Sequence, residues 1–147
     1  MDRQTTTAPG EMYALKGCQH RLKETVAAQT YELPVSTKIT ANSIENIVID
    51  ALECTSTYWV GVDNTTPEWA SKPKELPVSQ FATALLLSGK SVKLYDIEDN
   101  TEEWELTLEK LLEGIGKAML DGRTIEDIED DADTALQYAL FGEIVYG

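Results

Sequence analysis

The acidic residues of this chain are concentrated in its C-terminal part, and this distribution constrains the fold most strongly. Residues 91–147 contain 16 Asp and Glu against four Lys and Arg, whereas residues 1–90 contain ten against eight. Like charges repel one another and destabilise a compact state, so folding alone does not call for such a block. We expect it to be kept for another reason: a basic protein partner, a cation or simple solubility.

The composition limits the classes of protein to which the chain can belong. Its 147 residues, 42% of them apolar, are typical of one folded domain. A pI near 4.3 argues against direct binding to nucleic acid or to an anionic membrane, since both require basic surface. Residues 1–10 lack the pattern of a secretory signal or a transit peptide, so we expect a flexible tail on a cytoplasmic protein.

Alternating and helical patterns predict a mixed fold. Strands are expected at residues 31–40, 57–62, 91–99, 102–107 and 143–146, and helices at residues 42–54, 78–88, 108–121 and 132–141. Residues 12–28 have only a weak helical pattern. Strict βαβ alternation is missing, which favours a single α+β domain with about four helices packed on an antiparallel sheet. The domain covers residues 11–147, with residues 11–36 either part of it or a variable N-terminal extension.

Two of the predicted helices begin at residues that cap helices well. Asn42, followed three residues later by Glu45, is typical of a capping box, and Thr107 is placed to cap the helix at residues 108–121. Gly114 and Gly116 lie inside that helix. Each is expected to weaken it by about 1 kcal/mol relative to alanine.

The strands at residues 91–99 and 102–107 are predicted to form an acidic hairpin. A two-residue turn at Asn100 and Thr101 pairs Ile97 with Trp104 and Tyr95 with Leu106 on an apolar face. The same register places four carboxylates on the opposite face, as two directly opposed pairs: Asp96 with Glu105, and Glu98 with Glu103. Opposed like charges destabilise a sheet. The patch is interpreted either as a solvated face or as a surface that meets cations or arginines.

A second acidic block follows at residues 125–134. It contains Glu126, Asp127, Glu129, Asp130, Asp131 and Asp133. If the block is extended, Asp127, Glu129, Asp131 and Asp133 lie on one face at a spacing of about 6.7 Å. That spacing is close to the distance between every second phosphate of a duplex strand, because successive phosphates of one strand rise about 3.4 Å each. Alternatively, Asp131 to Asp133 begin a helix, where anions complement the helix dipole. A calcium-binding EF-hand loop is not matched, because Ala132 and Tyr138 stand where glycine and glutamate are required.

The proline-rich loop at residues 63–77 contains a tryptophan that we single out. Trp69 lies close to Lys72 and Lys74, a combination that could stack on a base and neutralise a phosphate. The alternative is a lid residue that folds back on the domain. The first interpretation makes these three residues the candidate ligand-binding set.

Catalytic motifs are missing from the sequence. His20 is the single histidine, and Cys18 and Cys54 lack metal-binding spacing, so they are interpreted as reduced thiols or, alternatively, as a disulfide. No P-loop, GxGxxG, GxSxG or HExxH motif is present. We therefore predict a protein that is not an enzyme and that uses no metal and no cofactor.

Several segments give the chain a resemblance to known sequences. These segments are TYWVG at residues 57–61, KLYD at 93–96, WELT at 104–107 and the ending QYALFGEIVYG at 137–147. In them, and over residues 37–147 as a whole, the chain resembles a group of small, acidic, uncharacterised proteins carried by phages and integrative elements of gut Firmicutes. The resemblance implies a phage or mobile-element accessory protein in the cytoplasm of a bacterial host. It carries no chemical motif and transfers no functional residue.

Three functions are consistent with these observations. The first is an inhibitor of a host defence protein of the anti-CRISPR or anti-restriction type, in which the two acidic blocks mimic nucleic acid and bind a basic groove. The second is a homo-oligomeric sponge for a nucleotide immune signal, with Trp69, Lys72 and Lys74 at the ligand. The third is a structural or regulatory accessory protein of the element.

Overall fold

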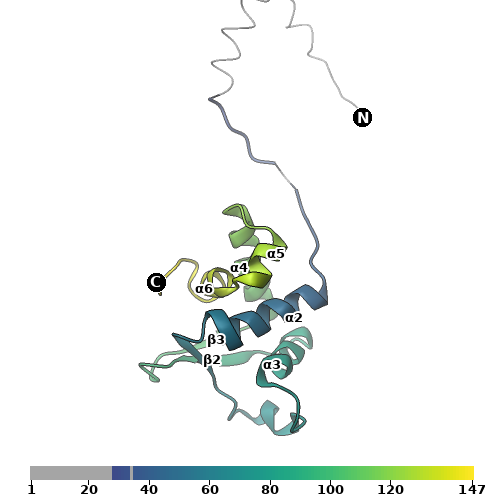
Figure 1. Ribbon diagram of the computed structural model, residues 1–147, viewed down its shortest axis with the longest axis vertical. Coiled ribbons are helices and arrows are strands. Elements are labelled where there is room, and N and C mark those ends of the chain that lie inside the picture. Colours follow the sequence, from purple (N-terminus) through teal and green to yellow (C-terminus); the bar gives the residue numbers. More distant parts are fainter. Residues whose placement is uncertain (1–27, 34) are drawn as a thin grey trace, which may run out of the picture. The chain divides into compact units, whose positions relative to one another are not determined.

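The expected α+β architecture is confirmed. The computed structural model describes residues 28–33 and 35–147, and the folded unit covers residues 38–147 (Figure 1). Within the described residues, five α-helices accompany a three-stranded antiparallel sheet of order β1–β2–β3. The helices are α2 (Ala41–Asp50), α3 (Val78–Leu87), α4 (Leu108–Leu120), α5 (Ile125–Asp130) and α6 (Asp133–Phe141). The strands are β1 (Val60–Val62), β2 (Val92–Asp96) and β3 (Glu103–Leu106).

Two short helices of other types complete the unit. A π-helix, η2 (Ala51–Thr55), continues α2, and a 3₁₀-helix, η3 (Pro67–Ser71), lies within the segment expected to be a plain loop. The expected flexible tail at residues 1–10 and most of the weak helix at residues 12–28 lie outside the described residues.

The strand expected at residues 31–40 is not formed by the residues of that segment that the structure describes. Residues 31–33 and 35–40 have no regular secondary structure, and the side chains of Tyr31, Leu33 and Val35 are 77–80% exposed. Strand preference reflects packing against neighbours on a half-buried surface. The alternating pattern alone is therefore not enough to make this segment a strand, because its apolar side chains gain no burial.

Helix α2 begins one residue before the predicted start, and its N-cap lies two residues before the predicted one. Its N-cap is Thr40, whose Oγ1 accepts a hydrogen bond from the backbone N–H of Ser43 at 3.1 Å, so the proposed capping role of Asn42 is wrong. Both residue types cap helices, and the sequence offers them two positions apart. The apolar face of the helix is nonetheless as predicted, with Ile44, Ile47 and Val48 buried.

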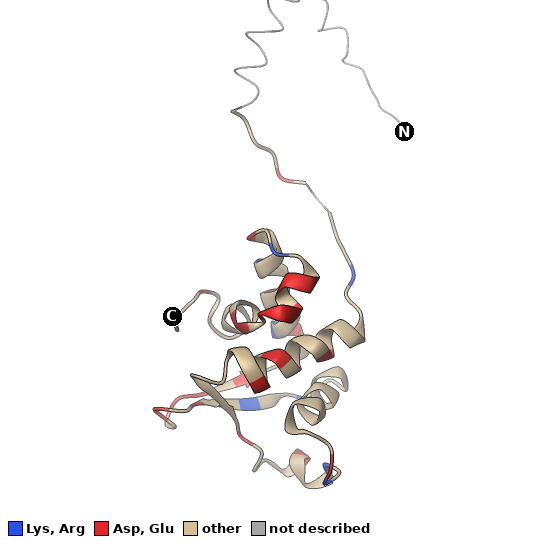
Figure 2. Ribbon diagram, viewed as in Figure 1, with Lys and Arg blue, Asp and Glu red and all other residues tan. Residues whose placement is uncertain are grey.

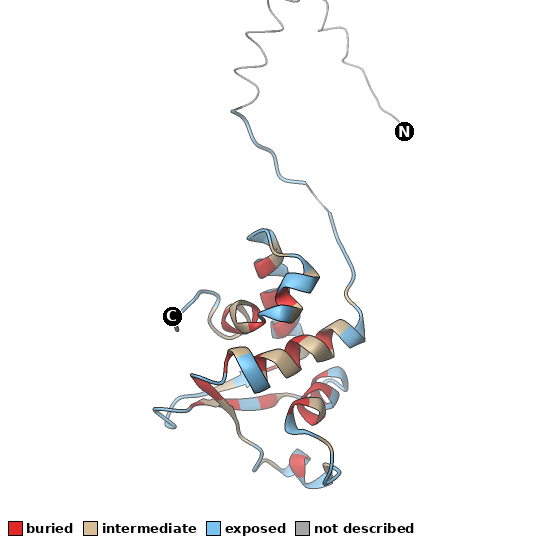
Figure 3. Cartoon of the chain, viewed as in Figure 1, coloured by how far each residue is buried: buried red, intermediate tan, exposed pale blue. Residues whose placement is uncertain are grey.

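The core lies between the helices and one face of the sheet. Figure 3 shows buried residues on the inward sides of α2, α3, α4 and α6 and along β2. The inner face of β2 contributes Val92 and Leu94, both fully buried, opposite Leu106 and Trp104 of β3. The expected cap of α4 is confirmed, since Thr107 Oγ1 accepts from the N–H of Lys110 at 3.2 Å.

Helices α4 and α6 approach each other closely at a glycine. A Cβ atom added at Gly114 would lie 2.3 Å from the carbonyl oxygen of Ala135 and 2.6 Å from the backbone nitrogen of Ala139. Gly116, two residues later, has nothing within 4 Å of such an atom. The two glycines expected to weaken the helix equally therefore have different roles, and Gly114 sets the distance between the helices.

The final strand expected at residues 143–146 is not formed either. These residues leave α6 at Gly142, which has a left-handed φ of 75°, and continue without regular structure. The side-chain amide of Gln137 makes hydrogen bonds to their backbone, as a neighbouring strand would. Its Oε1 accepts hydrogen bonds from the N–H groups of Val145 at 2.7 Å and Tyr146 at 2.8 Å, and its Nε2 donates to the carbonyl of Tyr146 at 3.0 Å. We call residues 143–147 the C-terminal tail.

Candidate functional site

The hairpin has a different register from the predicted one. Trp104 pairs with Leu94 rather than with Ile97, and Glu105 pairs with Lys93 rather than with Asp96. The turn is a longer loop, closed where the N–H of Asp96 donates to the carbonyl of Glu102 at 3.0 Å. A shift of three residues is odd, so it exchanges the two faces of a strand. The predicted register is therefore wrong, and its four carboxylates do not share one face.

Asp96 points toward the interior and has internal partners. It is 9% exposed, and its Oδ2 accepts a hydrogen bond from the Tyr146 hydroxyl at 2.6 Å. Its Oδ1 accepts from the N–H groups of Glu98 at 2.7 Å and Asp99 at 3.0 Å. The Tyr146 hydroxyl and these two N–H groups hold the pKa of Asp96 below its ordinary value. Asp96 thus links the hairpin loop to the C-terminal tail. Glu98, whose N–H binds Asp96, lies on the exposed hairpin loop.

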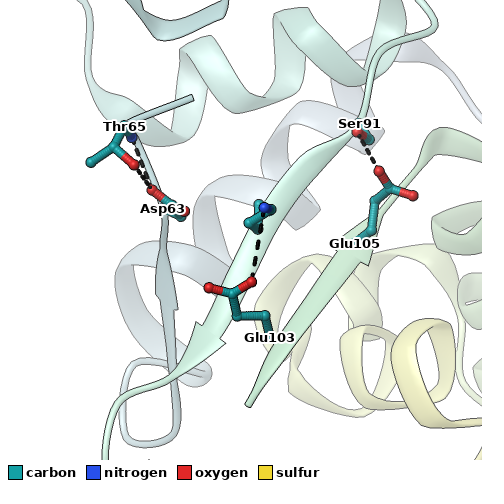
Figure 4. Close-up of polar contacts among 6 residues, drawn as sticks. Asp63, Thr65, Ser91, Glu103 and Glu105 are labelled. Carbon is teal, nitrogen blue, oxygen red and sulfur yellow. Dashed lines mark hydrogen bonds and ion pairs between the residues drawn. The ribbon is translucent and has the colours of Figure 1, made fainter. Parts of the chain in front are cut away.

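The outer face of the sheet carries mixed charge instead of paired like charges. Lys93 lies opposite Glu105, and its Nζ is 3.8 Å from Glu103 Oε1. Asp63 directly follows β1, on the other side of β2 from Glu103 and Glu105. Hydrogen bonds from Thr65, and then the charge of Lys93, lower the pKa of Asp63. Figure 4 shows Asp63 with Thr65, the ion pair made by Glu103, and Glu105 with Ser91. Pairs of opposite sign stabilise a sheet, which gives a physical reason for the observed register.

The second acidic block is helical rather than extended. Residues 125–130 form α5, which opens with a capping box between Thr124 and Asp127. The N–H and hydroxyl of Thr124 hold the pKa of Asp127 below its ordinary value. The extended interpretation, with carboxylates about 6.7 Å apart, is therefore wrong. The alternative is correct for Asp133, which lies in the first turn of α6.

Asp133 is the centre of a hydrogen-bonded cluster. Its Oδ1 accepts from Ser56 Oγ at 2.6 Å and from Trp59 Nε1 at 2.7 Å. Its Oδ2 accepts from Gln137 Nε2 at 2.8 Å and from the Tyr58 hydroxyl at 3.0 Å. Ser56, Trp59 and Gln137 are at most 2% exposed, so this carboxylate satisfies buried donors. It joins the segment between η2 and β1 to helix α6.

The structure places helix α2, which carries acidic residues of its own, next to the second block. The segment α2–η2 packs beside α5, where Asn46 Nδ2 donates to Glu129 Oε1 at 3.0 Å and the N–H of Ala132 donates to Asp50 Oδ2 at 2.8 Å. Figure 2 shows acidic residues on both helices. We call these two segments the α2–α5 surface. Its carboxylates are Glu45, Asp50, Glu53, Glu126, Asp127, Glu129 and Asp130, with Asp131 directly after it, and neither segment contains Lys or Arg.

Basic residues do little to neutralise these charges. Residues 38–147 contain 22 Asp and Glu against eight Lys and Arg, which gives this unit the whole net charge of −14. Within the part of the chain that the structure describes, Lys93–Glu103 is the one ion pair. Lys110 donates to the carbonyl of Glu105 at 2.8 Å, and Lys117 donates to the carbonyl of Gly142 and lies over the Tyr138 ring. Most carboxylates on the surface are therefore uncompensated.

Trp69 is not an exposed stacking residue. It is 7% exposed within η3, and its ring lies 5.1 Å from that of Phe81. Lys72 Nζ donates to the carbonyls of Leu76 at 2.7 Å and Pro73 at 3.1 Å, while Lys74 is exposed. The loop has folded back on the domain, as the alternative interpretation held. Because the indole is buried and Lys72 donates to two backbone carbonyls, these residues are not arranged as the exposed stacking and phosphate-binding set that the sequence predicted.

An open hollow lies where the start of β1, the hairpin loop and the C-terminal tail meet. It has a volume of about 200 Å³ and is lined by Tyr58, Trp59, Asp96, Glu98, Tyr146 and Gly147. The rings of Trp59 and Tyr146 are stacked, with centroids 4.6 Å apart and planes 10° from parallel. Sequence reasoning missed this site because the tail was expected to be a strand. The clustering of Trp, Tyr and carboxylates near residues 58, 96 and 146 was its only signal.

We expect the phenol of Tyr146 to titrate abnormally. The hydrogen bond to Asp96, followed by burial and the charges around it, raises the pKa of Tyr146 to about 12 from 10.0. Because the folded pKa is raised, the tail contact contributes stability that is complete below pH 10 and is lost as the pH rises toward 12. The pKa values of Tyr58 and Tyr138 are also raised, so phenolate absorbance during an alkaline titration should show a late phase to which Tyr146 contributes, and Tyr146→Phe should reduce the amplitude of that phase by one tyrosine. A Tyr146→Phe variant that keeps the full late amplitude would contradict this assignment.

In the part of the chain that the structure describes, the remaining candidates for chemistry form no metal site. Among the described residues, no group of three or more His, Cys, Asp or Glu side chains is arranged to hold a metal ion. Cys54 is exposed with a free thiol, and Cys18 and His20 lie outside the described residues. None of the described helices is both long and apolar enough to cross a membrane.

Comparison with known proteins adds no family. No protein-family model, curated protein or solved structure matches the chain. The charge and geometry of the described surface are therefore the features from which a function can be inferred.

Proposed function

We propose that this chain is a non-enzymatic binding protein that recognises a basic protein partner through its α2–α5 surface. One observation carries the proposal: the unit of residues 38–147 holds 22 acidic residues against eight basic ones, with one ion pair among its described residues. Uncompensated like charge destabilises a compact state and is favourable once a complementary surface binds it. A basic partner supplies that complement.

The α2–α5 surface is a better centre for this interaction than the sheet face of the hairpin. Glu103 and Glu105 have Lys93 beside them, and Asp96 has internal partners. By contrast, Glu126, Asp130 and Asp131 are exposed, and their side chains accept no hydrogen bond within the described residues. Their charge is fully available to a partner, and no basic residue follows Arg123 in the chain.

The partner that we propose is a nucleic-acid-binding defence protein of the bacterial host. A protein that binds nucleic acid presents a groove of Lys and Arg to phosphates, and a rigid surface of carboxylates can occupy the same groove. The resemblance to phage and mobile-element accessory proteins supports this choice of partner. The chain would then act in the host cytoplasm as an inhibitor. A structural or regulatory role in the element remains the alternative when no such partner binds.

Nucleotide sequestration finds less support in the geometry. A sponge for an anionic signal needs cations at the ligand, and Lys72 donates to two backbone carbonyls while Trp69 is buried.

Removing charge from the α2–α5 surface should weaken partner binding. We expect the triple variant Glu126→Gln, Asp130→Asn, Asp131→Asn to lose about tenfold in affinity for the partner captured from a host lysate, since three exposed pairs contribute about 0.5 kcal/mol each. Binding should also fall as salt rises. Capture at low and at high salt, followed by mass spectrometry and titration of the identified partner, measures both effects.

A variant with the same change in net charge provides the control. Glu103→Gln, Glu105→Gln, Glu109→Gln removes three exposed carboxylates from the hairpin and the start of α4 and should leave affinity within about twofold. Equal losses in both triple variants would mean that net charge alone acts, and the α2–α5 surface would lose its assigned role. Capture of no basic protein at low salt would contradict the proposed function itself.

A further inference from the structure

The hollow beside the C-terminal tail combines aromatic rings with carboxylates. Its walls come from separate parts of the chain: Tyr58 and Trp59 precede β1, Asp96 and Glu98 end β2 and begin the hairpin loop, and Tyr146 lies in the tail. Hydrogen bonds fix these walls, because Asp96 accepts from Tyr146 at 2.6 Å and the Tyr58 hydroxyl donates to Asp133 at 3.0 Å and to the carbonyl of Tyr146 at 3.3 Å. The site is thus ordered before a ligand arrives, which limits the entropy lost on binding.

The potential inside the hollow is negative. Asp96 and Glu98 line it, and no Lys or Arg does. The pKa of Tyr146 reports the same field, since the nearby charges that raise it are the carboxylates of Asp96, Glu102 and Asp99. A phosphate or carboxylate ligand would be repelled. A cation would be attracted without displacing any charged side chain.

One carboxylate in the hollow is available for a ligand. Both oxygens of Asp96 already accept hydrogen bonds. The Glu98 side chain is exposed and accepts none within the described residues. Glu98 can therefore pair with an incoming donor, while Asp96 contributes its charge from behind. The exposed ring of Tyr58 and the half-buried ring of Tyr146, which is stacked on the buried Trp59, provide aromatic surface.

We propose that this hollow binds one arginine side chain of the partner. The inference deepens the proposed function, on which it rests, by naming the group that the partner inserts. A guanidinium is planar, stacks on aromatic rings and donates two parallel hydrogen bonds to a carboxylate, which an ammonium cannot do. Aromatic surface and a free carboxylate in one hollow of about 200 Å³ fit that geometry.

The test uses the full chain and a defined small probe. N-acetyl-arginine amide is titrated into ¹⁵N-labelled protein, and N-acetyl-lysine amide is titrated in parallel. We expect saturable shifts of the Trp59 indole N–H and of the Glu98, Tyr146 and Gly147 amides with the arginine probe, and weaker binding of the lysine probe. Shifts that do not saturate, or that spread evenly over the α2–α5 surface, would overturn the proposal.

Matched variants decide whether the hollow is responsible. Glu98→Gln keeps the size of the side chain and should weaken the arginine probe about fivefold, as expected for one charged pair near the surface. Glu105→Gln, on the outer face of the sheet, removes the same charge and should leave binding unchanged. Equal affinity of wild type and Glu98→Gln would refute the assignment.

The two proposals fail in different ways. If partner capture depends on Glu126, Asp130 and Asp131 but the arginine probe gives no localised shift, the surface is the interface and the hollow has no role. If the probe binds at the hollow but no basic protein is captured from the lysate, arginine recognition holds and the proposed function is wrong.

Discussion

Gly114→Ala should lower the free energy of unfolding by about 3 kcal/mol, the upper part of the usual range for overpacking a core. The added Cβ would lie 2.3 Å from the carbonyl oxygen of Ala135 and 2.6 Å from the backbone nitrogen of Ala139. Both are backbone atoms of α6, so no side-chain rotation relieves the overlap. Helices α4 and α6 must move apart, and this separation loosens packing around Ile115 and Leu136, which are buried. Urea unfolding followed by tryptophan fluorescence measures the change.

Gly116→Ala is the matched control for this prediction. The substitution is chemically the same and lies in the same helix, but nothing is within 4 Å of the added atom. It should raise the free energy of unfolding by about 0.5–1 kcal/mol through better helix propensity. If both variants are stabilised, α4 and α6 are not as close as described.

Asp133→Ala should cost about 3–4 kcal/mol, because it leaves several buried donors without an acceptor. Ser56, Trp59 and Gln137, all nearly inaccessible to solvent, lose their shared carboxylate. Asp133→Asn should also destabilise, since an amide NH₂ in place of one oxygen faces a donor. Thermal and urea unfolding measure the loss, and an NMR shift of the Trp59 indole N–H reports it locally.

Asp131→Ala separates this hydrogen-bonding role from an effect of charge. It removes one negative charge two residues away, at an exposed position whose side chain accepts no hydrogen bond within the described residues. We expect a change within about 0.5 kcal/mol. Equal destabilisation by the two substitutions would mean that the cluster around Asp133 does not stabilise the fold.

The sequence was informative wherever one local rule decided the structure. The apolar spacing of Ile44, Ile47 and Val48 located α2, and the side chain of Thr107 located the start of α4. The α+β class followed from the mixture of such segments. These features depend on neighbours a few residues away, so periodicity and capping patterns contain them.

The wrong predictions concern features that are determined by residues far apart in the sequence. A two-residue turn and a longer loop are both compatible with residues 97–102, and packing of Leu94 and Trp104 with the Lys93–Glu105 pair selects the longer one. With the longer loop, Asp96 points inward and the predicted acidic patch is not formed. Asp133 looked like one more surface carboxylate, because its donors at residues 56–59 are more than 70 residues away in the sequence.

Trp69 and the C-terminal tail illustrate the same limit. No residue near Trp69 in the sequence indicates that Phe81 is its neighbour in the core. The alternation of the tail is real, but the amide of Gln137 takes the place of a neighbouring strand. A side chain that satisfies backbone groups in this way leaves no periodic signal.

The attachment of the tail has a consequence for the order in which the molecule folds. Tyr146 reaches Asp96 across 50 residues and Tyr58 across 88, and it adds an aromatic ring to Trp59 rather than extending the sheet. Contacts between such distant residues cost chain entropy before they return any energy, so they form late. The tail should therefore dock last and open first, with hydrogen exchange at Val145 and Tyr146 faster than in α6. Because the tail also forms one wall of the hollow, its local opening would remove the aromatic surface there while the rest of the fold stays intact.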